Sequence, residues 1–317
     1  MSRTLISIVI PTHNELTNVE AVYSRVRAVF EALPDFDFEL IFSDDSTDST
    51  PNEIARLHVA DPRVKLIRLS RRFSQAIAIS AGLRRAAGEA AILMDADLQD
   101  PPEEIPRMLA LWREGNHVVY AERASASSYA LYKTLAAFFY RLLKRVSSID
   151  IPLDAGEFRL LDRKVINFMR NLTERSRFMR GLTVWPGLRQ AKIQIERAAR
   201  LSGQTNYNFR RSFLVAVDGL VSFSVVPLRL IALFGTLVAI LSLLFGFGFL
   251  VARLLVPDIF GRGWPSLFVS IYFMGGVQLM FLGIIGEYIG RIFIEVQNRP
   301  LYWVDFELGF PDAEKTS

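Results

Sequence analysis

Two carboxylates separated by one residue, Asp95 and Asp97, stand where an apolar run of the sequence ends. Side chains two residues apart in a strand point to the same face, so these carboxylates would lie close together. Close carboxylates repel, and one of them stays protonated unless a cation lies between them. Gln99 adds a further oxygen, and hard oxygen ligands suit Mg²⁺ or Mn²⁺, which usually share their shell with substrate phosphates. The same stretch also fits a solvated strand end ahead of a helix.

Polar residues follow the apolar runs at several other places, and Asn, Asp, Ser and Thr are also ordinary turn residues. If the runs are parallel strands, their carboxyl ends meet at one edge of a sheet, where ligands bind. Polar residues after four strands that end at the same edge are better explained by one ligand-binding site than by four unrelated turns. Neither G-x-G-x-x-G nor G-x-x-x-x-G-K-[ST] occurs, so a dinucleotide Rossmann site or a P-loop is not expected. The four places are Pro11–Glu15, Ser43–Thr50, Asp95–Asp100 and Arg123.

Strand-like and helix-like patterns alternate through the first part of the chain. Apolar, β-branched runs predict strands, and apolar residues at helical spacing predict the helices between them. This alternation predicts an α/β fold with a mostly parallel sheet covered by helices on both faces. Asp100 is expected to cap the helix that Pro101 and Pro102 begin. The predicted strands are 5–11, 38–45, 64–70, 90–97 and 117–123, and the predicted helices are 20–33, 51–60, 75–87 and 100–114.

Composition excludes several kinds of site. The chain has 317 residues, of which 51% are hydrophobic and 22% charged. It contains no cysteine, which rules out disulfides, zinc–thiolate sites and a cysteine nucleophile. Its three histidines, His13, His58 and His117, are far apart in sequence, so a histidine-rich metal site is not expected. A net charge of +4 without a long basic run does not indicate a nucleic-acid partner.

Two segments near the C-terminus, Leu230–Ala252 and Gly263–Gly286, contain no charged residue. At about 1.5 Å per residue, each is long enough as a helix to cross a hydrocarbon core of about 30 Å. Two spans place both chain ends on one side of the membrane. The N-terminus does not resemble a signal peptide, and cationic residues flank the pair of spans, so both ends are expected in the cytosol. Glycines in the second segment favour close helix packing, either within the chain or between the subunits of a homo-oligomer.

An ordered series of motifs extends over nearly the whole chain and includes SIVIPTHNE, SDDSTDST, SRRFSQAIAISAGL, LMDADLQDPPEEIP, DAGEFRLLDR, RLSGQTNY, FSVVPLR and GEYIGRIFIEVQNRPLY. In this series the sequence resembles the glycosyltransferases of family 2 with a GT-A, Rossmann-like fold. Within that family it is similar to the polyprenyl-phosphate glycosyltransferases, related to dolichol-phosphate mannose synthase and to bacterial undecaprenyl-phosphate glucosyltransferases. The D-x-D pattern alone would be too short to show this.

The resemblance implies a membrane-bound, inverting enzyme that uses Mg²⁺ or Mn²⁺. It would transfer a hexose, with glucose expected first, from a nucleotide-diphosphate sugar such as UDP-glucose to undecaprenyl or dolichyl phosphate. A lipid phosphate is already anionic, so its attack needs no general base. The implied domains are a cytosolic catalytic domain over 1–205, interfacial juxtamembrane helices over 206–229, a transmembrane hairpin over 230–290 and a cytosolic C-terminal tail over 291–317.

The resemblance also implies roles for individual residues. Asp95 and Asp97 would act in catalysis together with an acid at Asp154, with Glu157 as a second such acid. The implied metal ligands are Asp95, Asp97 and Gln99. The implied phosphate contacts are Arg123 and Arg200. Arg210 and Arg211 are further expected phosphate contacts, because they lie in the interfacial segment that leads to the first span and would meet the lipid phosphate there. The implied nucleotide-sugar contacts are Pro11, His13, Glu15, Asp44, Asp95, Ala96 and Arg123.

The sequence departs from the family pattern at several positions. Asp45 and Ser49 replace glycines after the second strand, so the turn loses two positions that tolerate φ > 0. Asn206 replaces a cationic phosphate contact, and Glu157 stands where close relatives often carry Asp. Two alternatives therefore stay open. One is a processive polysaccharide synthase-like transferase, although the Q-x-x-R-W motif of those proteins is absent. The other is a membrane partner that binds nucleotide sugars without turnover.

Overall fold

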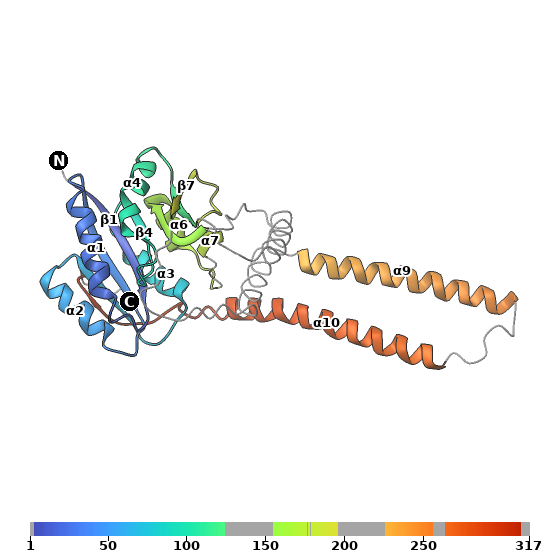
Figure 1. The fold of residues 1–317 in the computed structure, drawn as a ribbon. Helices are drawn as coiled ribbons and strands as arrows, with labels where there is room; N and C mark the ends of the chain where they lie inside the picture. The colour runs from blue at the N-terminus through green and yellow to red at the C-terminus, as the bar shows by residue number, and fades with distance from the viewer. Residues whose placement is uncertain are drawn as a thin grey trace. The chain divides into compact units, whose positions relative to one another are not determined.

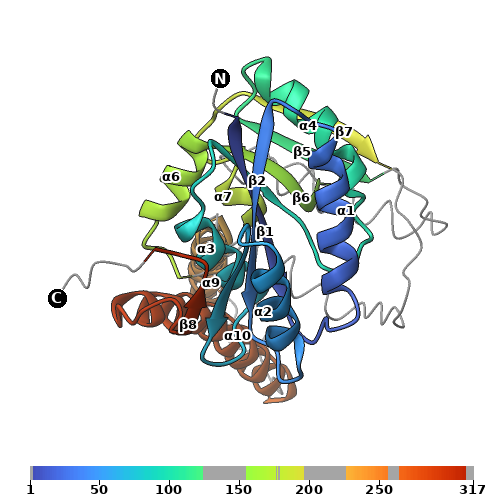
Figure 2. The ribbon, with the colours of Figure 1, turned by 90° about the vertical axis from the view of Figure 1, so that its left-hand side faces the viewer.

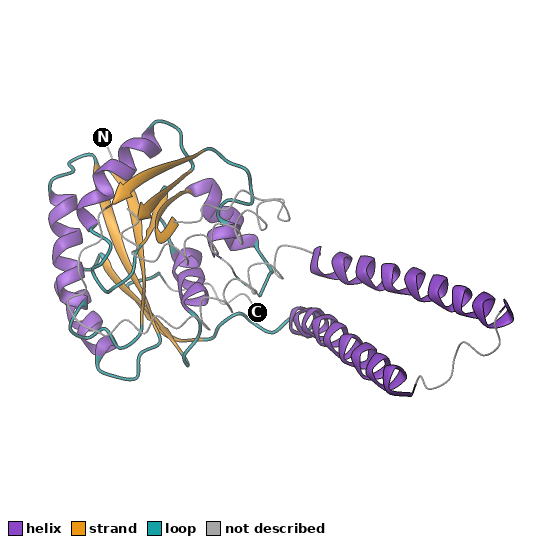
Figure 3. Cartoon of the chain, turned by 45° about the vertical axis from the view of Figure 1, so that its right-hand side comes forward, coloured by secondary structure: helices purple, strands orange, loops and turns teal. Residues whose placement is uncertain are grey.

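The structure is a computed structural model, and it describes residues 3–123, 155–175, 177, 179–195, 226–255 and 264–311. The chain divides into two compact units. Figure 3 shows strands only in the first unit, while the described part of the second unit consists of two helices and the short stretch after the second one. The first unit comprises residues 1–144, 149–208 and 299–317, and the second comprises 145–148 and 209–298.

The first unit contains an eight-stranded sheet within the described residues, in the order β7-β5-β6-β4-β1-β2-β3-β8. Figure 1 labels β1, β4 and β7 of this sheet. The central strands β4, β1, β2 and β3 are parallel, which confirms the expected parallel core. β7 is parallel to β5, whereas β6 runs antiparallel to both β4 and β5, and β8 runs antiparallel to β3. The strands are β1 (Thr4–Thr12), β2 (Phe36–Asp44), β3 (Val64–Leu69), β4 (Ala90–Leu93), β5 (Val118–Arg123), β6 (Ala155–Asp162), β7 (Gln190–Ile195) and β8 (Val304–Leu308).

Helices cover both faces of this sheet, as the alternating pattern predicts (Figure 2). One face carries α3 and α6, and the other carries α1, α2 and α4. Each of the predicted helices is present, with ends that differ by a few residues. The helices of this unit are α1 (Val19–Glu31), α2 (Thr50–Ala60), α3 (Gln75–Arg85), the 3₁₀ turn η1 (Pro102–Glu104), α4 (Ile105–Arg113), α6 (Arg163–Asn171) and α7 (Met179–Leu182).

The strands are apolar on both sides because both faces are covered. Ile6, Ile8 and Ile10 of β1 belong to the larger core, which also includes the buried faces of α1, α2 and α4. A smaller core lies under α3 and is formed by Ile41, Ile67, Leu69, Ala78, Ala81 and Ala86.

Two local predictions around the D-x-D pair are wrong. β4 ends at Leu93, so Asp95 and Asp97 lie in the turn after the strand and not on one face of it. Leu98 within this turn has a φ of 56°, which shows that the chain bends sharply after the acids. Asp100 does not cap a helix, because neither η1 nor α4 has a side-chain cap hydrogen bond. Asp100 is instead buried, with 1% of its surface exposed.

A strand was missed in the segment that the sequence analysis assigned only to a C-terminal tail. β8 lies after the last long helix of the chain and pairs with the edge strand β3, with Ile67 opposite Glu307. Arg85 forms an ion pair with Glu307, and its guanidinium lies 5.0 Å from the ring centre of Phe310. The segment around β8 is therefore built into the α/β unit.

The second unit contains two long helices, α9 (Val226–Leu255) and α10 (Trp264–Val296), over the two uncharged segments. They pack on each other, and the rings of Phe234 and Phe281 meet edge to face at 5.8 Å. Within the described residues, one stretch, Phe273–Val296, is long and apolar enough to cross a membrane, as judged by length and composition. A second span is thus not shown by this criterion. The interfacial helices expected over 206–229 lie almost wholly outside the described residues.

Candidate functional site

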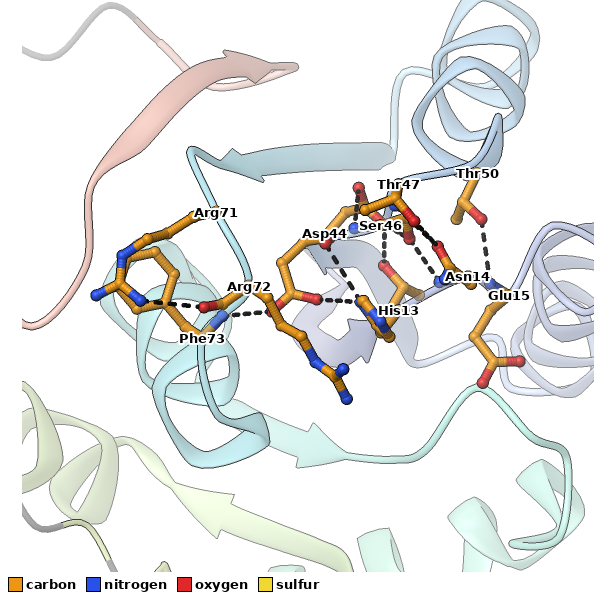
Figure 4. Close-up of polar contacts among 12 residues, drawn as sticks. His13, Asn14, Glu15, Asp44, Ser46, Thr47, Thr50, Arg71, Arg72 and Phe73 are labelled. Atoms are coloured by element: carbon orange, nitrogen blue, oxygen red, sulfur yellow. Dashed lines mark hydrogen bonds and ion pairs between the residues drawn. The ribbon is translucent and has the colours of Figure 1, made fainter.

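The loops after β1 and β2 are joined around the buried carboxylate of Asp44 (Figure 4). Thr12 Oγ1 donates to Asp44 Oδ1 at 2.9 Å, and Ser46 Oγ donates to the same oxygen at 2.5 Å. Arg68 of β3 forms an ion pair with Asp44 Oδ2. Because both oxygens are engaged and the residue has no exposed surface, Asp44 shapes the loop in this arrangement. Its direct contact with a nucleotide stays a prediction.

Asn14 holds the same two loops together from the exposed side (Figure 4). Its φ of 59° lies in the left-handed region, which Asn adopts more readily than most residues. Its backbone N–H donates to Ser46 Oγ at 2.8 Å, and its side-chain oxygen accepts from the N–H groups of Thr47 and Asp48 at 2.8 Å and 3.3 Å. Asn14 was not predicted as a site residue, although its place in the polar PTHNE turn indicated that it lies at this edge of the sheet.

Asp45 connects three loops of this edge. Its Oδ1 lies 2.7 Å from His13 Nδ1, and its Oδ2 accepts from the N–H of Phe73 at 2.8 Å, in the loop after β3. The replacement of glycines in this turn does not place a side chain on a backbone with positive φ. Among the described residues, neither Asp45 nor Ser49 is one of the non-glycine residues with positive φ. The turn is built without a left-handed residue at either position, and the carboxylate of Asp45 gains a structural role.

The other residues predicted to contact the nucleotide sugar lie in strands, in a loop or in the core, and for some of them the side chain is not described. Pro11 lies in β1 opposite Ser43, and Glu15 is half-buried with its carboxylate accepting from Asn18 Nδ2 at 2.6 Å. Ala96 packs into the large core, so only its backbone can face a ligand. Arg123 ends β5 next to β7, but its side chain lies outside the described residues. Asp154, Arg200, Arg210 and Arg211 also lie outside the described residues.

Three other carboxylates act on Asp95 at the carboxyl end of β4. Burial raises the pKa of Asp95 to about 7, and the negative charges of Asp100, Asp97 and Glu157 add to this rise. Gln75 at the start of α3 partly offsets it by donating from Nε2 to Asp95 Oδ1 at 2.6 Å. The electrostatic repulsion expected from the sequence is therefore present, and it involves more acids than the D-x-D pair.

Glu157, the acid of this group that is most distant in sequence from Asp95, lies in β6. β4 and β6 are antiparallel with Leu93 opposite Arg159, and Glu157 lies two residues before Arg159 in β6, towards the end of the sheet where the turn after β4 begins. Arg180 Nε donates to Glu157 Oε1 at 2.9 Å, and the buried guanidinium of Arg159 lies 3.8 Å from Oε2. Glu157 thus carries its own cationic partners while it faces the cluster.

The oxygen atoms at this edge fit a divalent cation that is shared with a substrate. Gln99 is 3% exposed, and its side-chain oxygen is buried without a hydrogen-bond partner. A cation beside Asp95 and Asp97 would relieve the repulsion that raises the pKa of Asp95. Within the described part of the chain, no three Asp, Glu, His or Cys side chains are arranged to hold a metal ion. Mg²⁺ commonly takes only one or two carboxylates and completes its shell with phosphates and waters.

Several contributors to this edge were not predicted from the sequence. Gln75 had a signal, because it follows β3, whose carboxyl end lies at the same edge as the other loops. Asp100 was predicted to cap a helix. Its negative charge raises the pKa of Asp95 because the turn after β4 brings the two residues together, and residue spacing does not predict this turn. Arg180 had no such signal, since it lies in the short helix α7 and reaches the edge only through Glu157.

Comparison with known proteins places this chain among glycosyltransferases. The family description Glycosyl transferase family 2 matches residues 7–169. A glycosyltransferase of Synechocystis sp., itself named as uncharacterized, is 42% identical over 301 residues, covering 94% of each chain. The SfII prophage-derived bactoprenol glucosyl transferase of Shigella flexneri is 40% identical over 302 residues, covering 94% of this chain and 96% of that protein.

Among solved structures, glucosyl-3-phosphoglycerate synthase from Mycobacterium tuberculosis in complex with uridine diphosphate is a distant match. Its sequence is 18% identical to this chain, and the match covers 68% of this chain and 79% of the synthase chain, with a TM-score of 0.47.

Proposed function

This chain belongs to glycosyltransferase family 2, and on that premise we propose that it transfers glucose from a nucleoside-diphosphate sugar to a polyprenyl phosphate. The relatives named bactoprenol glucosyl transferase, which match over nearly their whole length, support both the sugar and the lipid acceptor. The observation that carries the proposal is the carboxylate cluster around Asp95, beside the loops that Asp44 and Asp45 join.

We place the diphosphate of the donor at the carboxyl end of β4. Asp95 and Asp97, with the side-chain oxygen of Gln99, would hold a Mg²⁺ or Mn²⁺ ion there. When bound, the cation would neutralise charge on the departing nucleoside diphosphate. Arg180 is one-third exposed and already lies beside Glu157, so its guanidinium is available to a phosphate oxygen at the same edge.

The nucleoside would lie against the joined loops after β1 and β2. His13 is one-third exposed and is oriented by Asp45, which leaves the rest of its ring free to contact a base or ribose. Asp44 would act by keeping Thr12 and Ser46 in place, because its own carboxylate is engaged.

The acceptor phosphate needs no deprotonation, so the acids at this edge serve to position and to balance charge. We propose a single displacement that inverts the anomeric carbon, with Asp154 near the reacting centre and Glu157 holding Arg180. Arg123, Arg200, Arg210 and Arg211 are the proposed contacts for phosphate groups of the donor or the lipid.

We also propose that α9 and α10 both span the membrane and that both chain ends lie in the cytosol. The absence of charge from Leu230 to Ala252 and from Gly263 to Gly286 supports two spans. A lipid-linked acceptor supports the same placement, since the enzyme must meet it at the membrane surface.

The proposal is tested with the full chain purified in detergent. UDP-glucose and undecaprenyl phosphate with Mg²⁺ or Mn²⁺ should give a lipid-linked glucose, and EDTA should abolish it. Asp97→Asn should lower the rate by about 100-fold or more, as expected for a lost charge at a reacting phosphate. Asp35→Asn is the matched control, because the side chain of Asp35 pairs with Arg113 at the exposed surface.

A panel of other nucleotide sugars extends the same assay. Transfer only from another donor would revise the sugar but keep the reaction. A product with many sugars per lipid would favour the processive alternative. If no common nucleotide sugar gave a metal-dependent lipid product, the chain would be a binding partner without turnover and the proposal would be wrong.

A further inference from the structure

The chain returns to the sheet directly after α10, and the point at which it returns is the start of the loop after β3. We call residues 70–75, which include the first residue of α3, the β3–α3 loop. The N–H of Ser70 donates to the backbone oxygen of Trp303 at 3.0 Å, just before β8 begins. The pairing of β3 with β8 is irregular between Arg68 and Leu69, immediately before this contact. The first residues after the long helix therefore set where the β3–α3 loop begins.

The β3–α3 loop touches both halves of the candidate site. Near its middle, the N–H of Phe73 donates to Asp45, which in turn orients His13. At its end, Gln75 donates to Asp95 in the carboxylate cluster. A shift of this loop would therefore disturb the loops proposed for the nucleoside and the acids proposed for the diphosphate at the same time.

Tyr302 shares a small hydrophobic core with this loop. Both Tyr302 and Phe73 pack against the core under α3, which includes Leu69 and Ala78. The guanidinium of Arg71 lies over the ring of Phe73, 4.1 Å from the ring centre (Figure 4). The neighbouring Trp303 side chain contributes little to this packing, because 68% of it is exposed.

The remainder of the C-terminal segment is fixed to the sheet at several further points. Arg85 and Glu307 form an ion pair, and Lys65 lies 5.1 Å from the ring centre of Phe310. Gly309, with a φ of 80°, lies so close to His58 that an added Cβ would approach its ring to 2.8 Å. Tyr302 thus belongs to a firmly attached segment and can act as a fixed support for the β3–α3 loop.

We propose that Tyr302 is a positioning residue for the donor site, which it supports through Phe73 and the β3–α3 loop although it lies beyond the last membrane helix in the sequence. This inference rests on the proposed function for the identity of the donor. It predicts that the C-terminal segment affects the binding of the nucleotide sugar more than that of the lipid acceptor.

The kinetic test compares three variants of the full chain in detergent. Tyr302→Ala should raise the KM for the nucleotide sugar by about tenfold, because loss of the ring lets the β3–α3 loop shift away from the loops proposed to bind the nucleoside. The KM for polyprenyl phosphate should stay near that of the unchanged protein. Tyr302→Phe keeps the ring and should restore the donor KM. Trp303→Ala is the matched control, because it removes an exposed aromatic side chain from the adjacent position.

A second measurement does not require activity. Hydrogen exchange of the full chain should show faster exchange of the Ser70 and Phe73 amides in Tyr302→Ala, with β1 and α1 unchanged. Unchanged exchange at these amides would overturn the positioning role, whether or not the chain transfers sugar. An equal rise in both KM values, or faster exchange throughout the α/β unit, would also overturn it, since either shows general destabilisation. An inactive unchanged protein would instead refute the proposed function and leave the exchange result to stand.

Discussion

The carboxylate of Asp95 is held in a place that favours its neutral form. It is partly buried in a turn, and the charges of Asp100, Asp97 and Glu157 act on it together. In the folded chain its pKa is about 7, against an ordinary value of 3.8. The folded state therefore binds the proton more tightly than the unfolded state, so ionisation lowers stability as the pH rises from about 4 to about 7.

Asp95→Asn should stabilise the metal-free protein while it abolishes transfer. The gain in the midpoint of thermal unfolding, measured in detergent with EDTA, should be larger at about pH 8 than at about pH 5, because the cost of ionising Asp95 grows between them. Adding Mg²⁺ or Mn²⁺ should stabilise the unchanged protein and narrow the difference. The control Asp35→Asn should show no such pH dependence. A gain that is equal at both pH values would show that charge on Asp95 is not its cause.

At the scale of elements, α3 connects the core of the sheet to the candidate site. Gln75 at its start reaches Asp95, and Gly82 in its last turns lies against β1 and β2. A Cβ added at Gly82 would lie 2.4 Å from Val9 Cγ1 and 2.9 Å from Ser43 Oγ. The helix can therefore lie this close to the sheet only with glycine at that position.

Gly82→Ala should push α3 away from the sheet and move Gln75 relative to Asp95. Overpacking of this kind costs about 1–3 kcal/mol, so the midpoint of thermal unfolding should fall by several degrees. The donor KM should rise as well. Arg84→Ala is the control on the same helix, because Arg84 is exposed. Equal unfolding midpoints for the two variants would contradict the close approach seen at Gly82.

The elements that the sequence could predict are those with a strong local pattern. The strands from β1 to β5 and the helices between them follow from apolar periodicity, and Asp95 and Asp97 could be found because they end such a run. β6 and β8 could not be placed in this way. β6 enters the sheet antiparallel between β4 and β5, and β8 joins an edge strand more than 200 residues earlier in the sequence. The approach of Glu157 to Asp95 and of Tyr302 to the β3–α3 loop depends on these pairings, so local spacing gave no sign of it.

At the scale of the whole molecule, the absence of cysteine permits a direct test of the proposed topology. Single cysteines can be introduced as Asp305→Cys, on the exposed side of β8, and as Gly261→Cys, between the two long helices. A membrane-impermeant thiol reagent should label Gly261→Cys in intact cells and Asp305→Cys only after lysis. The unchanged chain is the control and should not be labelled. Protection of both positions until lysis would contradict two spans.

The pairing of β8 with β3 also constrains the order in which the molecule can be completed. Synthesis proceeds from the N-terminus, at about 5–20 residues per second, so β1 to β7 and both long helices leave the ribosome before β8 does. Until then the edge of β3 presents unpaired backbone groups, which favour association with other chains. Only a chain that has been synthesised through Leu308 can close this edge. Premature termination or C-terminal proteolysis should therefore leave β3 as an unpaired edge strand in the cell. Quality-control proteases could recognise this exposed edge and so distinguish chains that lack β8 from those that contain it.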